Sequence, residues 1–76
     1  MAKTKLKLLR EELNPKVVQE DLAKIANMRL STYRNAEQGR NITYTTAKTI
    51  LAALNSIRTS RGMNPLNLED LDLSTV

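Results

Sequence analysis

Polar side chains able to donate or accept paired hydrogen bonds gather near the middle of the chain. With Tyr33 placed inward on a helix that turns about 100° per residue, one outward face collects Ser31, Arg34, Asn35 and Gln38. An arginine can donate in a fork to guanine O6 and N7, an asparagine can pair with adenine N6 and N7, and a serine hydroxyl can donate or accept. The chemistry available on this face is the reading of base edges. On composition alone, however, an ordinary solvated helix surface explains the same face better.

Catalytic and metal chemistry find no support in the residue types. The chain has no Cys and no His, which removes thiolate and imidazole groups and the common zinc ligand sets built on them. Its eight carboxylates are scattered, and no glycine-rich loop is present that could cradle a phosphate. We therefore expect no enzyme, no cofactor, no metal site and no small-molecule ligand.

Charge is distributed unevenly along the sequence. All twelve Lys and Arg residues lie within residues 1–61, which carry a charge of +7, whereas residues 63–76 contain three acids and no base. That −3 reduces the net charge to +4. A basic body with an acidic tail favours a polyanionic partner for the body, although solvated Lys and Arg faces alone account for most small basic proteins.

Length and hydropathy limit the architecture. A chain of 76 residues has room for one domain, and its apolar residues are mostly Leu, Ile and Ala, with no Phe or Trp, a mixture that favours helices. The longest apolar run is residues 50–54, far short of the roughly 18 residues needed to cross a bilayer. The basic N-terminus also lacks the apolar stretch of a secretory signal. We expect a soluble, cytoplasmic protein with no membrane partner.

The first two expected helices flank a proline. Leu6, Leu9 and Leu13 form one apolar stripe that predicts a helix over about 4–13, which Asn14-Pro15 closes because proline disfavours helical geometry in the residue before it. A second helix is predicted over about 18–26, with an apolar side made of Val18, Leu22, Ile25 and Ala26. Asn27 tolerates the left-handed conformation better than most residues, so we predict a sharp turn there.

The remaining segments complete an all-α fold. A third helix is predicted over about 30–38, ending at Gly39, and a fourth starts near Thr43 as its cap and ends at Gly62. A short closing helix is expected around 68–71. We predict a compact bundle of four to five helices, with a main domain at 1–62 and an acidic, leucine-containing tail at 63–76. The tail leucines, 66, 68, 71 and 73, either cover the chain's own core or form a dimer contact.

One spacing fits many residues across the second and third expected helices. The residues are Gln19-Glu20-Asp21-Leu22-Ala23, Asn27-Met28, Tyr33 and Ala36-Glu37-Gln38-Gly39, with Glu37 fourteen positions after Ala23. This pattern resembles the motif of the phage repressor and Cro-type (Xre-like) helix-turn-helix family, over roughly residues 5–55. Asn27 stands where the family usually has glycine, and Val18 stands where it often has a Ser or Thr cap.

The resemblance implies a lambda-repressor-like domain and a function. The expected function is that of a transcriptional regulator, acting as a repressor, that binds a specific sequence of double-stranded DNA with the helix at about 30–38 in the major groove. Family members commonly bind as homodimers, which we expect here. The alternative is a helix-turn-helix module used for protein contact, such as an antitoxin or an adaptor.

The resemblance also assigns residues to roles. For base readout it implies Arg29, Leu30, Ser31, Arg34, Asn35 and Gln38, and for phosphate contact it implies Gln19, Arg40, Asn41, Thr43 and Tyr44. Several alternatives stay open, because Leu30 could complete the core, Thr43 could cap the fourth helix, Tyr44 could pack on it, and Arg29 could meet a base or a phosphate. Arg10 and Glu37 match positions that often form a partly buried ion pair, the alternative being that both are exposed to solvent.

Overall fold

The computed structural model describes residues 4–75, which form five helices around one core. These are α1 (Lys5–Glu11), α2 (Gln19–Ile25), α3 (Leu30–Glu37), α4 (Tyr44–Ser60) and α5 (Leu68–Leu71). The expected all-α bundle is confirmed. The outermost residues of the two predicted parts, 1–3 and 76, lie outside the described residues. None of the helices in the described range is long and apolar enough to span a bilayer.

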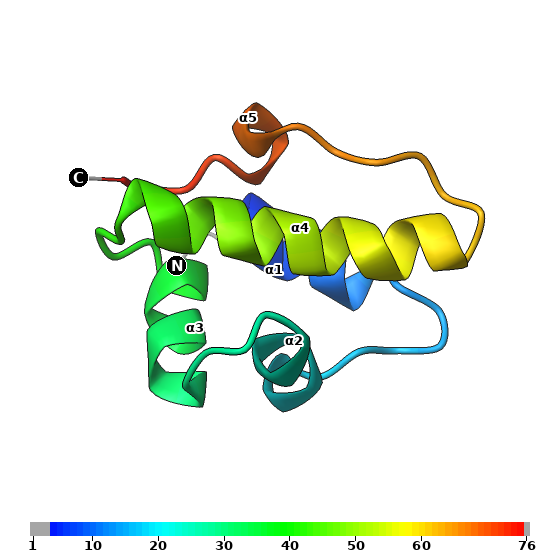
Figure 1. Cartoon of the computed structure of the whole chain (residues 1–76), viewed down its shortest axis with the longest axis horizontal. Coiled ribbons are helices and arrows are strands. Elements are labelled where there is room, and N and C mark those ends of the chain that lie inside the picture. The colour runs from blue at the N-terminus through cyan, green and yellow to red at the C-terminus, as the bar shows by residue number, and fades with distance from the viewer. Residues whose placement is uncertain (1–3, 76) are drawn as a thin grey trace.

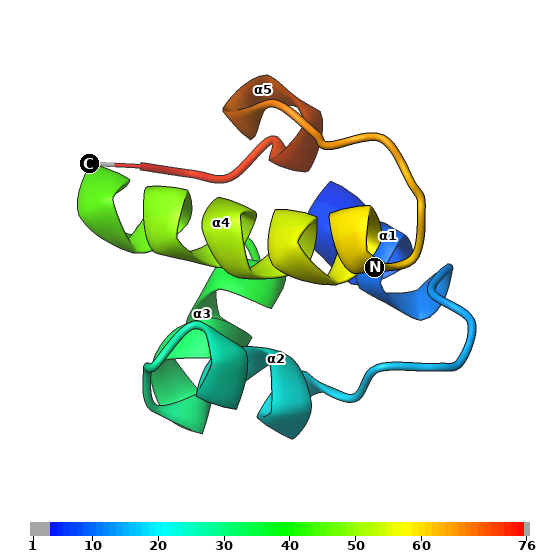
Figure 2. The ribbon, with the colours of Figure 1, turned by 45° about the vertical axis from the view of Figure 1, so that its right-hand side comes forward.

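Helix α4 is the axis of the molecule. Helices α2 and α3 lie on one side of it and α5 lies on the other, as the two views agree (Figures 1 and 2). Its Ala47, Ile50, Leu54 and Ile57 recur at helical spacing and are buried. The helix begins at the Thr43 cap, and the chain leaves it near Gly62, whose φ is +75°. A single long apolar stripe thus binds both halves of the fold together.

Helix α1 is shorter than predicted at its C-terminal end. Its first turn is capped by Thr4, whose hydroxyl oxygen accepts from the Lys7 amide at 3.2 Å. The helix stops at Glu11 instead of reaching Leu13, although Leu13 is still buried. Pro15 explains the early end, because it disfavours helical geometry at Asn14 and cannot donate a backbone hydrogen bond.

Helix α2 presents a narrower apolar side than predicted. Leu22, Ala23 and Ala26 face the core, but Val18 is 48% exposed and Ile25 is 51% exposed. The prediction of a single side containing Val18 and Ile25 was therefore wrong. On a helical wheel both residues lie about 90° to 110° from the centre of the buried set. The neighbouring helices α3 and α4 cover only the buried side of α2, and Val18 and Ile25 lie outside it.

The tail after Gly62 packs on the chain's own core. Leu71 is fully buried, and Leu66, Leu68 and Leu73 are half-buried against the same cluster. Asn55 of α4 fixes the returning chain, because its side chain donates to the Leu66 carbonyl at 2.9 Å and accepts from the Leu66 amide at 2.7 Å. Of the two expected roles for the tail leucines, covering the core is the one seen in the described residues.

Candidate nucleic-acid interface

The corner between α2 and α3 is made by one left-handed residue. Asn27 has a φ of 55°, and the amides of Asn27 and Met28 donate to the carbonyls of Lys24 and Ala23, each at 3.0 Å. Ala23, on α2, is buried, and a side chain of a single methyl group suits a close approach of the two helices. Asparagine therefore occupies the usual glycine position at this corner, with the geometry that glycine would take.

The outward face of α3 is mostly uncovered by the rest of the described chain. The helix buries Tyr33, Ala36 and Glu37. The polar side chains expected to read bases are accessible, with Asn35 half-buried and the others, Ser31, Arg34 and Gln38, exposed. One side of the helix is thus packed against the core, while the opposite side leaves hydrogen-bonding groups accessible to solvent.

The start of α3 carries two further residues of the predicted readout set. Arg29 occupies the N-cap position, where its side chain makes no capping hydrogen bond and is exposed. Leu30 is half-buried and packs against the core, so it completes the core while keeping part of its surface accessible. Both are placed at the end of α3 that follows the corner at Asn27.

Arg10 and Glu37 form a buried, two-pronged ion pair between α1 and the end of α3. The Nε of Arg10 lies 2.6 Å from Oε2 of Glu37, and its Nη2 donates to Oε1 at 3.2 Å. The third guanidinium nitrogen donates to the Val17 carbonyl at 3.0 Å. Both residues are about 95% buried, and both charges removed from water have hydrogen-bonding partners that offset the cost of burial.

This pairing shifts the titration of both groups. Burial alone would raise the pKa of Glu37, but Arg10, the Tyr33 hydroxyl and Gln19 together outweigh it and hold the pKa below its ordinary value. The hydrogen bond to Glu37 raises the pKa of Arg10, against the opposing effect of burial. The neighbouring Tyr33 hydroxyl is buried, and burial followed by the nearby Glu37 charge raises its pKa. The pair therefore stays ionised at neutral pH.

Gln19 joins the buried pair to the outward face of α3. Its Nε2 donates to Oε1 of Glu37 at 3.0 Å, and its Oε1 accepts from Nε of Arg34 at 3.3 Å. The sequence pattern assigned Gln19 to a phosphate, whereas in this structure its side-chain amide is engaged within the protein. A continuous chain of hydrogen bonds thus runs from Arg10 through Glu37 and Gln19 to Arg34.

The loop after α3 holds the predicted phosphate-contact residues of the other flank. Gly39 has a φ of +81°, which favours glycine, and the Arg40 amide donates back to the Asn35 carbonyl at 3.0 Å. The side chains of Arg40 and Asn41 are exposed. The tight end of α3 therefore sets a cationic and an amide side chain beside the outward face of this helix.

Thr43 and Tyr44 occupy the start of α4. The Thr43 hydroxyl oxygen accepts from the Thr46 amide at 3.1 Å and its hydroxyl lies 2.8 Å from that of Thr46, so it serves as the helix cap. Tyr44 is 56% exposed, so its ring is not packed away on α4, although Lys48 places its ammonium 5.5 Å from the ring centroid. Both side chains remain accessible at a helix N-terminus, where backbone amides favour anions.

Sequence reasoning missed two long-range contacts that support this surface. The Thr4 hydroxyl donates to the Glu37 carbonyl at 2.8 Å, which ties the cap of α1 to the end of α3. The Ile42 amide donates to the Ser74 carbonyl at 2.9 Å. Thr4 was recognisable from the sequence as the start of a helix, but the local pattern does not identify Glu37 as its partner. Nothing in the sequence pattern indicated the contact of Ser74.

A family model described as helix-turn-helix matches residues 6–61, about three quarters of the chain. The matched range covers α1 from its second residue and all of α2, α3 and α4, and so includes the corner, the outward face of α3 and the loop that follows it. No match was found among curated proteins or among solved structures.

Proposed function

Because this chain belongs to the helix-turn-helix family of DNA-binding regulatory domains, we propose that it reads a specific double-stranded DNA sequence with α3 in the major groove. The observation that carries the proposal is the two-sided character of α3. Its inner residues lock it to the core, while Ser31, Arg34 and Asn35 remain accessible on the side facing away. These are side-chain types that bond to base edges, and we assign Arg29, Leu30 and Gln38 to the border of the same contact.

Phosphate contacts would position the domain on either side of this helix. Arg40 and Asn41 are exposed after the end of α3, and Thr43 and Tyr44 follow at the start of α4. We assign these four residues to phosphate contacts on that side of α3. Gln19 lies at the other flank, where the Nε2 hydrogen that is not used in the bond to Glu37 would donate to a phosphate oxygen.

We further propose that the protein acts as a repressor and as a homodimer. Occlusion of a promoter needs nothing beyond DNA binding, so the interface described above is sufficient for repression. A single recognition helix gives a small interface, and two copies on half-sites about one helical turn apart would bind more tightly. Leu71 belongs to the core, so the dimer contact would use other side chains.

Selection of bound DNA from a pool of random duplexes tests this proposal. We expect enrichment of a short site with two-fold symmetry, bound with an affinity that falls steeply with salt concentration. A pool that shows no enrichment after repeated rounds would contradict sequence-specific binding. The alternative, a protein-contact module, predicts complexes that persist when Arg34 and Arg40 are both neutralised.

A further inference from the structure

The C-terminal segment closes onto the loop between α3 and α4. The Ile42 amide donates to the Ser74 carbonyl at 2.9 Å, and a parallel bridge pairs Ile42 with Thr75. The Ser74 hydroxyl also donates to Oδ1 of Asn41. Figure 1 shows this last part of the chain, in red, running to the start of α4. The three contacts join segments more than thirty positions apart, and all of them fall on the loop that we assign to phosphate.

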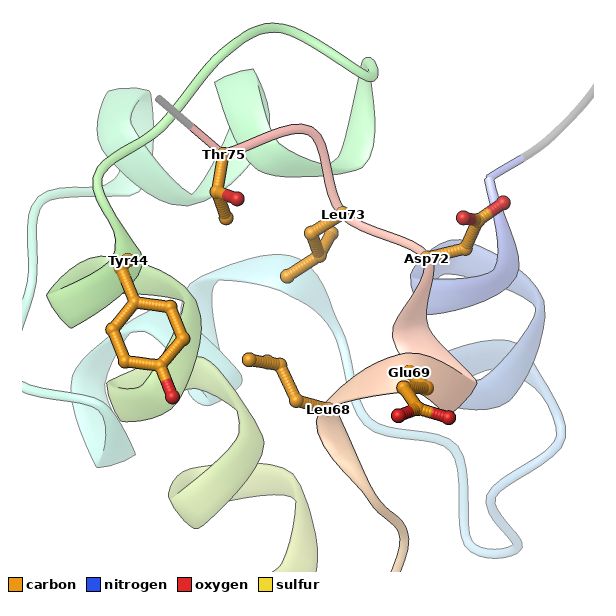
Figure 3. Close-up of a pocket in the computed structure, with 6 residues that line it drawn as sticks. All are labelled: Tyr44, Leu68, Glu69, Asp72, Leu73 and Thr75. Atoms are coloured by element: carbon orange, nitrogen blue, oxygen red, sulfur yellow. The ribbon is translucent and has the colours of Figure 1, made fainter.

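Both partners in this contact are anchored in the core. Ile42 is 7% exposed on the loop side, and Leu71 is fully buried where the tail leaves α5. Between them Asp72 takes a left-handed conformation, with φ 49° and ψ 46°, which turns the chain from α5 toward the loop. Figure 3 shows Leu73 and Thr75 following this turn, with Thr75 on the segment that approaches Tyr44. The tail and the loop therefore meet as two segments that are each fixed by a buried side chain.

From these contacts we propose that residues 73–75 position the loop at 39–43 for phosphate contact, with Ser74 and Thr75 as positioning residues that need not touch DNA. The inference rests on the proposed function. An exposed loop must be ordered when it binds, and fixing it beforehand lowers that entropic cost. The Ser74 hydroxyl also determines the orientation of the Asn41 amide, since Oδ1 accepts from it and the two Nδ2 hydrogens remain for an acceptor such as a phosphate oxygen.

A matched pair of substitutions at Asp72 separates geometry from charge. Asp72→Val and Asp72→Gly remove the same carboxylate, but only valine, which is branched at Cβ, resists the left-handed conformation. A chain shortened by residues 74–76 removes the loop contacts without removing any charged side chain. Ser56→Ala, at an exposed position on α4, is the control for Ser74→Ala.

Two readouts are needed for each variant. Amide hydrogen exchange of Ile42, compared with that of buried Leu54, reports whether the loop alone has loosened. Fluorescence anisotropy with a selected duplex and with a mixed-sequence duplex reports affinity. We expect Asp72→Val and the shortened chain to exchange Ile42 faster while Leu54 is unchanged, and to bind both duplexes about three- to tenfold more weakly. Ser74→Ala should show a smaller change in the same direction, and Asp72→Gly and Ser56→Ala should bind at least as well as the parent.

The outcomes distinguish this inference from the function on which it rests. If the parent binds DNA and the shortened chain binds equally well, or if its Ile42 amide stays as protected as before, the positioning role is wrong while the function stands. Equal weakening by Asp72→Val and Asp72→Gly would also overturn it, because the effect would then belong to the lost carboxylate. A parent that binds no duplex removes both proposals.

Discussion

Nε of Arg34 lies 3.3 Å from Oε1 of Gln19, so the side chain best suited to read guanine is held by the first residue of the neighbouring helix. Gln19 is itself held by the buried carboxylate of Glu37 at 3.0 Å. The ion pair in the core and the accessible face of α3 are therefore parts of one network. The buried pair is thereby linked, through Gln19, to the orientation of Arg34.

Removing one partner of the buried pair should destabilise the fold severely. Arg10→Met leaves the Glu37 carboxylate buried without its cationic partner, at a cost of about 3 to 5 kcal/mol in the free energy of unfolding. For a domain of this size such a loss approaches the whole stability. Urea unfolding followed by circular dichroism measures it.

The exposed pair of Lys24 and Glu20 is the matched control. Their charged atoms lie 3.7 Å apart with most of both side chains in solvent, so Glu20→Gln should change stability by less than about 1 kcal/mol. Equal effects of Arg10→Met and Glu20→Gln would show that burial of the first pair has no energetic consequence.

Stability should fall in acid through Glu37. Its folded pKa lies below the ordinary value of 4.5, so the unfolded state takes up a proton before the folded state does. The ionised pair stabilises the fold above that value, and the contribution is lost as the pH falls toward the lower, folded pKa. The stability difference between the parent and Glu37→Gln should therefore shrink between about pH 5 and pH 3. A difference that stays constant over this range would contradict the assignment.

Substitution on the outward face of α3 should relax base preference. Arg34→Ala and Asn35→Ala should each lose about 1 to 3 kcal/mol of discrimination at one or two base pairs, while the fold keeps most of its thermal stability because Arg34 is exposed and Asn35 is only half-buried. Repeating the duplex selection with each variant measures this. Base preferences identical to those of the parent in both variants would remove these residues from the readout set.

Gln19→Ala should act on the same base pair as Arg34→Ala. Gln19 holds Arg34 through its Oε1 atom. In a double-mutant cycle, the loss of specificity in the double variant should therefore be smaller than the sum of the losses in the two single variants. Full additivity would indicate that Gln19 acts only on phosphate or only on the Glu37 carboxylate.

Arg40→Ala should weaken binding to all sequences alike. A residue that contacts phosphate contributes through counterion release, so its removal should reduce the slope of log affinity against log salt by about one. Arg61→Ala removes the same charge at the far end of α4, about 25 Å along the helix axis from Tyr44, and should leave the slope nearly unchanged. A loss confined to one sequence would instead place Arg40 on a base.

Local chemistry made most of the helices predictable. Thr43, Asn27 and Gly39 each mark a boundary through a backbone or capping preference that acts within a few residues, and the structure has the boundary at each. Val18 and Ile25 were misplaced because a short apolar run on a wheel does not reveal which sector a neighbour will cover. The early end of α1 reflects a competition between the Leu13 stripe and Pro15 that spacing alone does not decide.

The contacts that hold the outward face of α3 and the loop after it could not be predicted from sequence patterns. Gln19 was recognisable as a motif residue, but its bonds to Glu37 and Arg34 depend on how α2 and α3 cross. The contact of Ser74 with the loop at Ile42 depends on the path of the whole tail around α4. Such relationships come from tertiary packing, which no local spacing encodes.

The central claim, that α3 meets DNA with its outward face, is tested most directly by nuclear magnetic resonance during titration with a selected duplex. We expect the largest chemical-shift changes in α3 and the loop at 39–44, including the Nε–H of Arg34, and small changes in α5 and in the last turns of α4. Shifts concentrated on α5 or on the C-terminal end of α4, with α3 unchanged, would contradict the account.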